Sequence, residues 1–176
     1  MSRSLRRSGD EDAGRFESFY ASHYEPIFAY AMRRTQAVED AADVVAETFL
    51  TAWRRRDQVP AGHAARLWLF GIARRVTANH VRGRLRYERL RQRIRLHVST
   101  SGAVVEPLDG DVAPVAAAFQ RLSPGDRDLL LMVAVEGLSS AELARVVGCS
   151  ATTARVRLHR ARTRFARQLK LVGVEV

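Results

Sequence analysis

The chain has 176 residues, of which 47% are apolar and 27% charged, with 29 Lys and Arg against 19 Asp and Glu. This composition excludes a wholly disordered chain, and no apolar run approaches the ~20 residues that a membrane-spanning helix needs. The single cysteine, Cys149, excludes a disulfide framework and a four-cysteine zinc site. The N-terminus has no apolar stretch behind its arginines, so we expect a cytoplasmic protein without membrane insertion.

The net charge of +10 is distributed unevenly along the chain. Residues 61–97 carry ten arginines and one acidic residue, and residues 124–176 carry nine basic and five acidic residues. Arginines that neutralise phosphates release condensed counterions, so two basic blocks indicate a nucleic acid as partner. A merely solvated surface is the alternative, although such surfaces normally mix charges of both signs.

The predicted fold is all-α, with two small helical domains joined by a flexible linker. Residues 1–13 are polar and aperiodic, which predicts a disordered tail. Residues 14–96 predict an N-terminal domain, since apolar residues recur at three- and four-residue steps from Arg15 to Arg56 and from Ala64 to Arg95. We expect Pro26 to bend or interrupt the first helix, and Gly83 is a candidate break in the last.

The second half of the chain predicts a linker over residues 97–113 and a helical domain over residues 114–170. Ser123 and Pro124 are typical of a helix start, and the helix is expected to reach Val135. Ser139 begins a short helix, whose expected inward residues are Leu143, Ala144 and Val147.

A helix-turn-helix is the sharpest motif in the sequence. Gly148 supplies the turn after the short helix, and Ser150 caps the next one. The second helix has a buried stripe formed by Ala154, Leu158, Ala161 and Phe165. Its opposite side is basic, with Arg155, Arg157, His159, Arg160 and Arg162. This pattern predicts a recognition helix that enters the major groove of DNA.

Two further segments carry polar patterns on helices. The segment Trp68–Arg82 places Arg74, Ala78 and Arg82 at four-residue steps behind aromatic residues, which suits phosphates and unstacked bases. The segment Asp40–Trp53 aligns Asp40, Asp43 and Glu47 along one edge, where like charges cost some helix stability. A basic partner surface would offset that cost, and a solvated edge is the alternative.

Taken in order, the three segments resemble the sigma-70 family of bacterial transcription initiation factors, specifically its short two-domain extracytoplasmic-function group. The resemblance covers about residues 15–86 and 114–167. It implies a sigma factor that binds core RNA polymerase, through its β′ and β subunits, and promoter DNA. It also implies an anti-sigma partner, and no catalytic residue, metal, cofactor or small-molecule substrate.

The resemblance also implies which residues make these contacts. Those expected to bind polymerase are Asp40, Asp43, Glu47, Phe49 and Trp53. Those expected to bind the −10 DNA element are His63, Trp68, Arg74, Arg75, Asn79 and Arg82. Those expected to bind the −35 element are Ser150, Thr152, Arg155, Val156, Arg157, His159 and Arg160.

The sequence departs from the family pattern at five of its positions. Members usually carry Glu and Gln where Ala42 and Ala46 stand. Asn is common at the position of Arg75, Asp at that of Asn79, and a small polar residue at that of Val156. Two other functions stay open on the residues alone. A stand-alone helix-turn-helix regulator would leave the first hundred residues unassigned, and a DNA recombinase would need a placed nucleophile or clustered carboxylates.

Overall fold

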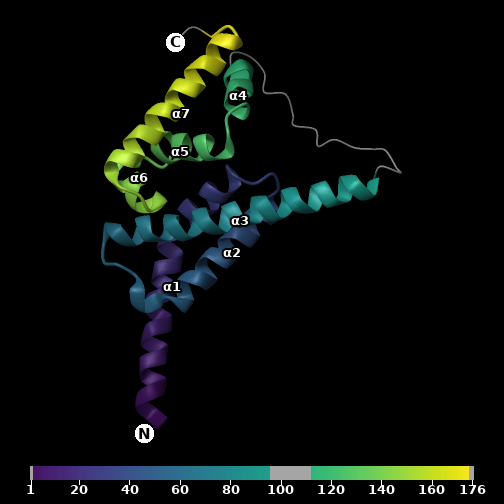
Figure 1. Cartoon of the computed structure of the whole chain (residues 1–176). Coiled ribbons are helices and arrows are strands. Elements are labelled where there is room, and N and C mark those ends of the chain that lie inside the picture. The colour runs from purple at the N-terminus through teal and green to yellow at the C-terminus, as the bar shows by residue number, and fades with distance from the viewer. Residues whose placement is uncertain (1, 96–111, 175–176) are drawn as a thin grey trace. The chain divides into compact units, whose positions relative to one another are not determined.

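The computed structural model describes residues 2–95 and 112–174, with side chains described for residues 12–87 and 113–174. The chain divides into two compact units, Met1–Leu90 and Arg91–Val176. Within the described ranges every element is helical, which confirms the predicted all-α class (Figure 1). No helix in the described part of the chain is long and apolar enough to cross a membrane.

The first unit contains α1 (Ser2–Met32), α2 (Val38–Arg54), the short 3-10 helix η1 (Arg56–Gln58) and α3 (His63–Arg95). Each α-helix contributes apolar side chains to a common core. Tyr30 of α1 is fully buried, and its ring centroid lies 5.5 Å from that of Phe70 on α3. The buried side chains of α2 are Ala41, Val44, Val45, Thr48, Phe49 and Ala52, which share one face of the helix.

Helix α1 differs from the predicted disordered tail, because it begins at Ser2 and runs through residues 2–13. One contact at the end of this part of the helix, and one just after it, attach α1 to its neighbours. Asp12 Oδ2 lies 3.7 Å from Arg56 Nε, and the Phe16 ring centroid lies 4.9 Å from that of Trp53. Extending an existing helix avoids the cost of nucleating a new one, so a polar segment adjoining a docked helix can remain helical.

The two expected helix breaks do not occur. Pro26 lies inside α1, and α3 continues through Gly83 without interruption. A glycine inside a helix costs about 1 kcal/mol relative to alanine, and a proline costs about 3 kcal/mol. After Pro26 the residues Ile27, Tyr30 and Ala31 are buried, and before it Phe16 and Phe19 pack on aromatic rings of α2, so contacts on both sides of the proline offset its local penalty.

The second unit contains α4 (Val112–Gln120), α5 (Pro124–Ala134), α6 (Ser140–Val147) and α7 (Ala151–Leu171). Helix α7 is central, since α4, α5 and α6 all pack against it (Figure 1). Helix α4 begins two residues before the expected start at residue 114. The rest of the predicted linker, residues 97–111, lies outside the described residues.

Local capping signals in the second unit are confirmed. The hydroxyls of Ser123, Ser139 and Ser150 each accept a hydrogen bond from a backbone N–H in the first turn that follows. Glu142 completes a capping box with Ser139, and Gly148 adopts the left-handed conformation at φ +73° that a side chain would disfavour.

The core of the second unit differs from expectation at two apolar positions. Val146 is fully buried in place of the expected Val147, which is half-buried. Phe165 is also half-buried and packs edge-to-face on Phe119 of α4, with ring centroids 5.8 Å apart. The three predicted stripe residues Ala154, Leu158 and Ala161 are buried.

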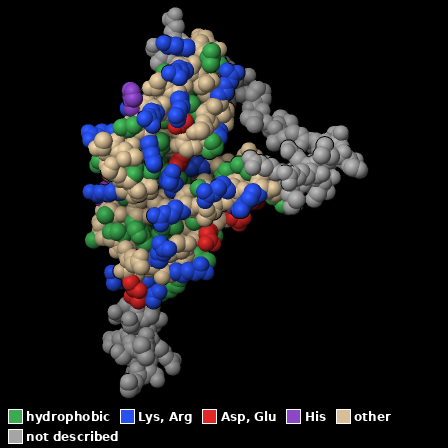
Figure 2. All heavy atoms as spheres, in the orientation of Figure 1, with side chains coloured by type: hydrophobic (Ala, Val, Ile, Leu, Met, Phe, Trp, Pro, Cys, Tyr) green, Lys and Arg blue, Asp and Glu red, His purple; other side chains and the backbone are tan. Residues whose placement is uncertain are grey.

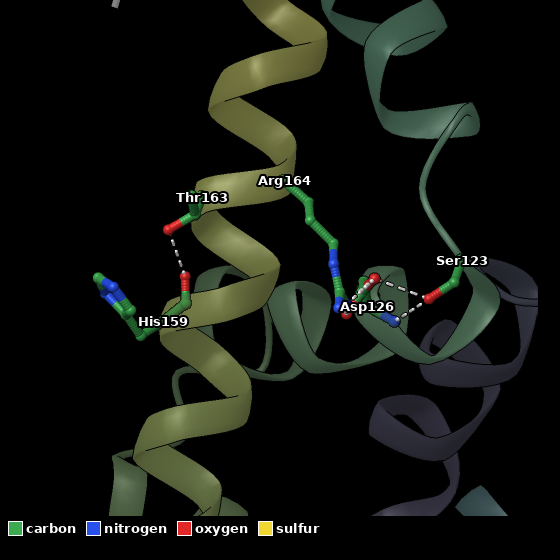
Figure 3. Close-up of polar contacts among 5 residues, drawn as sticks. All are labelled: Ser123, Asp126, His159, Thr163 and Arg164. Atoms are coloured by element: carbon green, nitrogen blue, oxygen red, sulfur yellow. Dashed lines mark hydrogen bonds and ion pairs between the residues drawn. The ribbon is translucent and has the colours of Figure 1, made fainter.

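An ion pair joins α5 to α7 across the second unit (Figure 3). Arg164 Nη1 donates to both carboxylate oxygens of Asp126, at 3.0 and 2.9 Å. Ser123 Oγ also donates to Asp126 Oδ2 at 2.8 Å while it accepts from the Asp126 N–H. The Asp126 side chain is only 10% exposed, so these donors replace most of its contact with water.

We expect Arg164→Ala to lower the free energy of unfolding of the second unit by about 1–2 kcal/mol, because it leaves the buried Asp126 carboxylate with one donor fewer. The 56% exposure of the Arg164 side chain keeps the value below that of a fully buried pair. Hydrogen exchange of the α5 and α7 amides in the full chain measures it.

The matched control is Arg167→Ala, which removes an exposed arginine from the same helix and should cost less than about 0.5 kcal/mol. Adding Asp126→Ala to Arg164→Ala should cost little more, because the stranded charge disappears. Equal losses for Arg164→Ala and Arg167→Ala would contradict a role for the ion pair.

Candidate nucleic-acid and protein interfaces

The acidic edge of α2, formed by Asp40, Asp43 and Glu47, is divided by the structure into two parts. Asp43 and Glu47 are exposed to solvent on the side opposite the buried face of α2. Asp40 instead contacts α3, since its Oδ1 lies 3.0 Å from His80 Nε2 and its Oδ2 lies 3.6 Å from Arg84 Nη1. Only 24% of the Asp40 side chain is exposed. Asp43 and Glu47 are therefore the two carboxylates of this edge that a partner can reach without breaking a contact with α3.

The two aromatic residues expected beside the acidic edge pack against α1. Phe49 is buried, and its ring centroid lies 4.6 Å from that of Tyr20. Trp53 is half-buried between Phe16 and the guanidinium of Arg56, which lies 4.9 Å from its ring centroid. Both side chains therefore lie beneath the acidic edge, with most of their surface in contact with other residues of the chain.

An exposed leucine beside the acidic edge was missed by the sequence reasoning. Leu50 lies three residues after Glu47 and seven after Asp43, so all three share one face of α2. Leu50 is among the exposed large apolar residues of the chain. Its spacing from the two carboxylates could have identified it, because a helix repeats its face at three and four residues.

Helix α3 presents a polar face away from the core of the first unit. Arg75, Asn79 and Arg82 are exposed, and Arg74 is half-buried. Arg82 Nη2 donates a hydrogen bond to Asn79 Oδ1 at 2.6 Å. This face gathers polar side chains one and two helical turns apart, as the sequence predicts.

The other two residues expected at the −10 DNA lie at the start of α3. His63 is exposed at its first position, and Trp68 is half-buried. Tyr87, near the other end of the described side chains of α3, is 63% exposed and stands next to Arg86. The sequence reasoning did not single it out, although an aromatic ring among arginines is a pattern that suits stacking on bases.

Helix α7 and its N-cap expose a polar surface on the side away from the buried stripe of Ala154, Leu158 and Ala161. The residues expected at the −35 element that are exposed are Ser150, Thr152, Arg155, Val156, Arg157, His159 and Arg160. Val156 is 44% exposed, so its side chain faces outward with its two arginine neighbours. Figure 3 shows the His159 ring pointing away from α7 on the side opposite Arg164.

Within this set Ser150 has a second task. Its hydroxyl accepts a hydrogen bond from the Thr153 N–H at 3.1 Å, so it stabilises the first turn of α7.

The basic character of the molecular surface is visible in Figure 2, where blue arginine and lysine side chains outnumber red acidic ones on the face in view. An amphipathic helix of this kind, rigidly supported by three others, can enter the major groove and contact both phosphates and base edges.

Comparison with known families finds two matches that correspond to the two units. Residues 19–87 match the model described as Sigma-70 region 2, and residues 113–165 match that described as Sigma-70, region 4. Among curated relatives, the ECF RNA polymerase sigma factor SigC of Mycobacterium tuberculosis is 37% identical over 134 residues, which cover 71% of this chain and 68% of SigC. The RNA polymerase sigma factor CarQ of Myxococcus xanthus is 30% identical over 174 residues, 97% of either chain.

Solved structures show the same fold. The sigma factor RpoE of Bartonella quintana, crystallised with the anti-sigma factor NepR, aligns with a TM-score of 0.62 at 24% identity, over 89% of this chain and 97% of that one. CnrH in complex with the cytosolic domain of CnrY aligns with a TM-score of 0.59 at 23% identity, over 89% and 88% of the two chains.

Proposed function

Because the chain belongs to the sigma-70 family, in its extracytoplasmic-function group, it is a non-catalytic RNA polymerase subunit that directs promoter-specific transcription initiation, and we propose a division of labour between its two units. The first unit docks on the polymerase and binds the −10 element. The second unit binds the −35 element. The observation that carries this proposal is that each unit supports one exposed basic helix face, on α3 and on α7.

The two other functions that the residues leave open are set aside by the family. A stand-alone regulator would leave the first half of the chain unassigned, whereas residues 19–87 match region 2. A recombinase would be an enzyme, whereas a sigma factor is a non-catalytic subunit.

Polymerase docking is proposed for the exposed part of the α2 edge, namely Asp43 and Glu47 with Leu50 beside them. Carboxylates around an accessible apolar side chain suit a basic partner surface, such as one on the β′ subunit that the resemblance implies as a partner. Phe49 and Trp53 support this surface from within the α1–α2 interface.

Promoter contacts are proposed on α3 and α7. On α3 the contacts to the −10 element come from Arg74, Arg75, Asn79 and Arg82, with His63 and Trp68 at the start of the helix. On α7 the face formed by Thr152, Arg155, Val156 and His159 repeats at three and four residues and is the part that reaches base edges. Arg157 and Arg160 flank it and suit phosphates, while Ser150 holds the first turn.

The test of the proposed function is run-off transcription with core polymerase and a promoter library. The chain should direct initiation at discrete start sites that share one −10 and one −35 sequence. Initiation that is the same with and without the chain would contradict the proposal.

We expect Asp40→Asn to leave polymerase affinity within about twofold, because Asp40 contacts His80 and Arg84 of α3. It should not weaken binding to the −10 element, because it removes a negative charge beside a DNA-binding helix. The matched control is Asp43→Asn, an exposed position on the same helix, which should weaken polymerase binding and leave DNA contacts intact. Titration of labelled core polymerase and of fork-junction DNA measures the two affinities. If Asp40→Asn costs as much polymerase affinity as Asp43→Asn, the whole acidic edge docks on the polymerase.

The cytoplasm, where polymerase and chromosome meet, is the proposed place of action. An anti-sigma factor is also a proposed partner, since RpoE and CnrH were both solved with protein partners, NepR and CnrY. Such a partner would cover exposed apolar side chains of α1 and α2, namely Tyr20, Tyr24 and Leu50.

A further inference from the structure

We propose that Asn79 and Arg82 act as one unit that presents hydrogen-bond donors to the −10 element and selects a keto base, guanine or thymine, over an amino base, adenine or cytosine. The inference rests on the proposed role of α3 in promoter binding and adds the chemical class of base that this part of the helix accepts. The juxtaposition of an amide and a guanidinium on adjacent turns carries it.

The amide of Asn79 has one orientation in this pair. Arg82 Nη2 donates to Asn79 Oδ1 at 2.6 Å, and a guanidinium has five N–H donors and no acceptor. The carbonyl oxygen of Asn79 therefore has to face Arg82, and the amide NH₂ faces away from it. Three residues separate the two positions, so both side chains lie on the same exposed face of α3.

This orientation disfavours the usual way in which asparagine recognises a base. A bidentate contact with adenine needs the amide oxygen and nitrogen together, one accepting from N6 and the other donating to N7. In the pair with Arg82 one lone pair of the oxygen is used, and the positive guanidinium repels the partly positive hydrogens of an amino group that approaches the other. The other polar groups of the pair, the Asn79 NH₂ and the remaining N–H groups of Arg82, are donors.

Keto and amino bases differ at the same exocyclic position. Guanine O6 and thymine O4 accept hydrogen bonds there, whereas adenine N6 and cytosine N4 donate them. A surface made of donors is complementary to the first pair. Asp, which is common in the family at the position of Asn79, would offer a carboxylate acceptor instead, so this one residue distinguishes the chain from such members.

Neighbouring basic residues on α3 are held differently. His80 and Arg84 face the carboxylate of Asp40 on α2, at 3.0 and 3.6 Å. They belong to the side of the helix that packs within the unit. The structure gives the Asn79–Arg82 pair no such contact with the described residues of α2. Among the described side chains of this part of α3, the pair is therefore a donor surface that can bind DNA without breaking a contact to another helix.

The experiment uses the full chain with core polymerase and fork-junction templates that carry each of the four bases at each −10 position. The parent protein should prefer guanine or thymine over adenine and cytosine at one position by about tenfold in affinity. Arg82→Ala should release the Asn79 oxygen and raise the relative affinity for adenine there, while Arg82→Lys, which keeps a positive donor, should preserve the keto preference. Asn79→Asp should shift the preference toward cytosine.

The matched control is Arg86→Ala, an exposed arginine four residues after Arg82 on the same helix. It should leave the ratio of affinities among the four bases unchanged. If Arg82→Ala lowers affinity for all four bases equally, Arg82 contacts phosphate alone and the inference is wrong, although the proposed function stands. If the parent protein shows no −10 preference and no promoter-dependent initiation, the inference falls together with the proposed function.

Discussion

Replacing both Asp43 and Glu47 by arginine should lower affinity for core polymerase by about 100-fold or more, because two positive charges would then face a positively charged partner surface. Both side chains are exposed and lie beyond the first turn of α2. The free energy of unfolding should therefore change by less than about 1 kcal/mol. Affinity is measured by titration against labelled core polymerase, and stability by thermal unfolding.

The control carries the same change in net charge at two exposed positions of α1, Glu17→Arg with Glu25→Arg. It should retain polymerase binding, which separates a local contact from a general effect of added positive charge. Normal binding by the Asp43 and Glu47 variant would show that docking uses another surface. Loss of binding together with unfolding would show that the edge stabilises the fold instead.

Replacing Arg155, Arg157 and Arg160 by alanine should lower affinity for −35 DNA by about 100-fold near physiological salt. It should also reduce the slope of log affinity against log salt by about 2 to 3. Each phosphate contact that is lost leaves about one more counterion on the DNA. The three side chains are exposed, and the buried stripe of α7 is untouched. Binding of the full chain to −35 duplexes across a salt series measures both quantities.

Arg167→Ala is the control for this experiment. It removes an exposed arginine from the same helix, about 10 Å along the axis from Arg160, and should leave the salt slope unchanged. Polymerase binding through the first unit should survive in both variants. A triple variant that keeps the parent slope would show that α7 does not meet phosphates through these residues.

Much of the second unit is readable from sequence because its signals act over three or four residues. The hydroxyls of Ser123, Ser139 and Ser150 cap helices whose first-turn N–H groups lie three positions on, and Gly148 permits the left-handed turn that any side chain would strain. The outward side of α7 follows from the same local period. These features need no knowledge of the rest of the chain.

Which side chains are buried could be predicted less well from the sequence. A local period places Val146 and Val147 on neighbouring faces, and only the position of α7 decides that Val146 is the buried one. Residues 2–13 likewise continue a helix that is attached by contacts of Asp12 with Arg56 and of Phe16 with Trp53, which join segments about forty residues apart.

The all-helical class, the serine caps of the second unit, the helix-turn-helix and the two basic blocks follow from spacing and charge among neighbouring residues, which the sequence shows directly. How side chains of one pattern differ in their contacts depends on the packing of the helices. Asp40 shares an edge with Asp43 and Glu47 in the sequence, but His80 and Arg84, some forty residues away, hold it against α3. Asp126 and Arg164 are 38 residues apart and meet because α5 packs on α7. A carboxylate's partner depends on which helix folds against it, and that packing is decided by the apolar core of the whole unit.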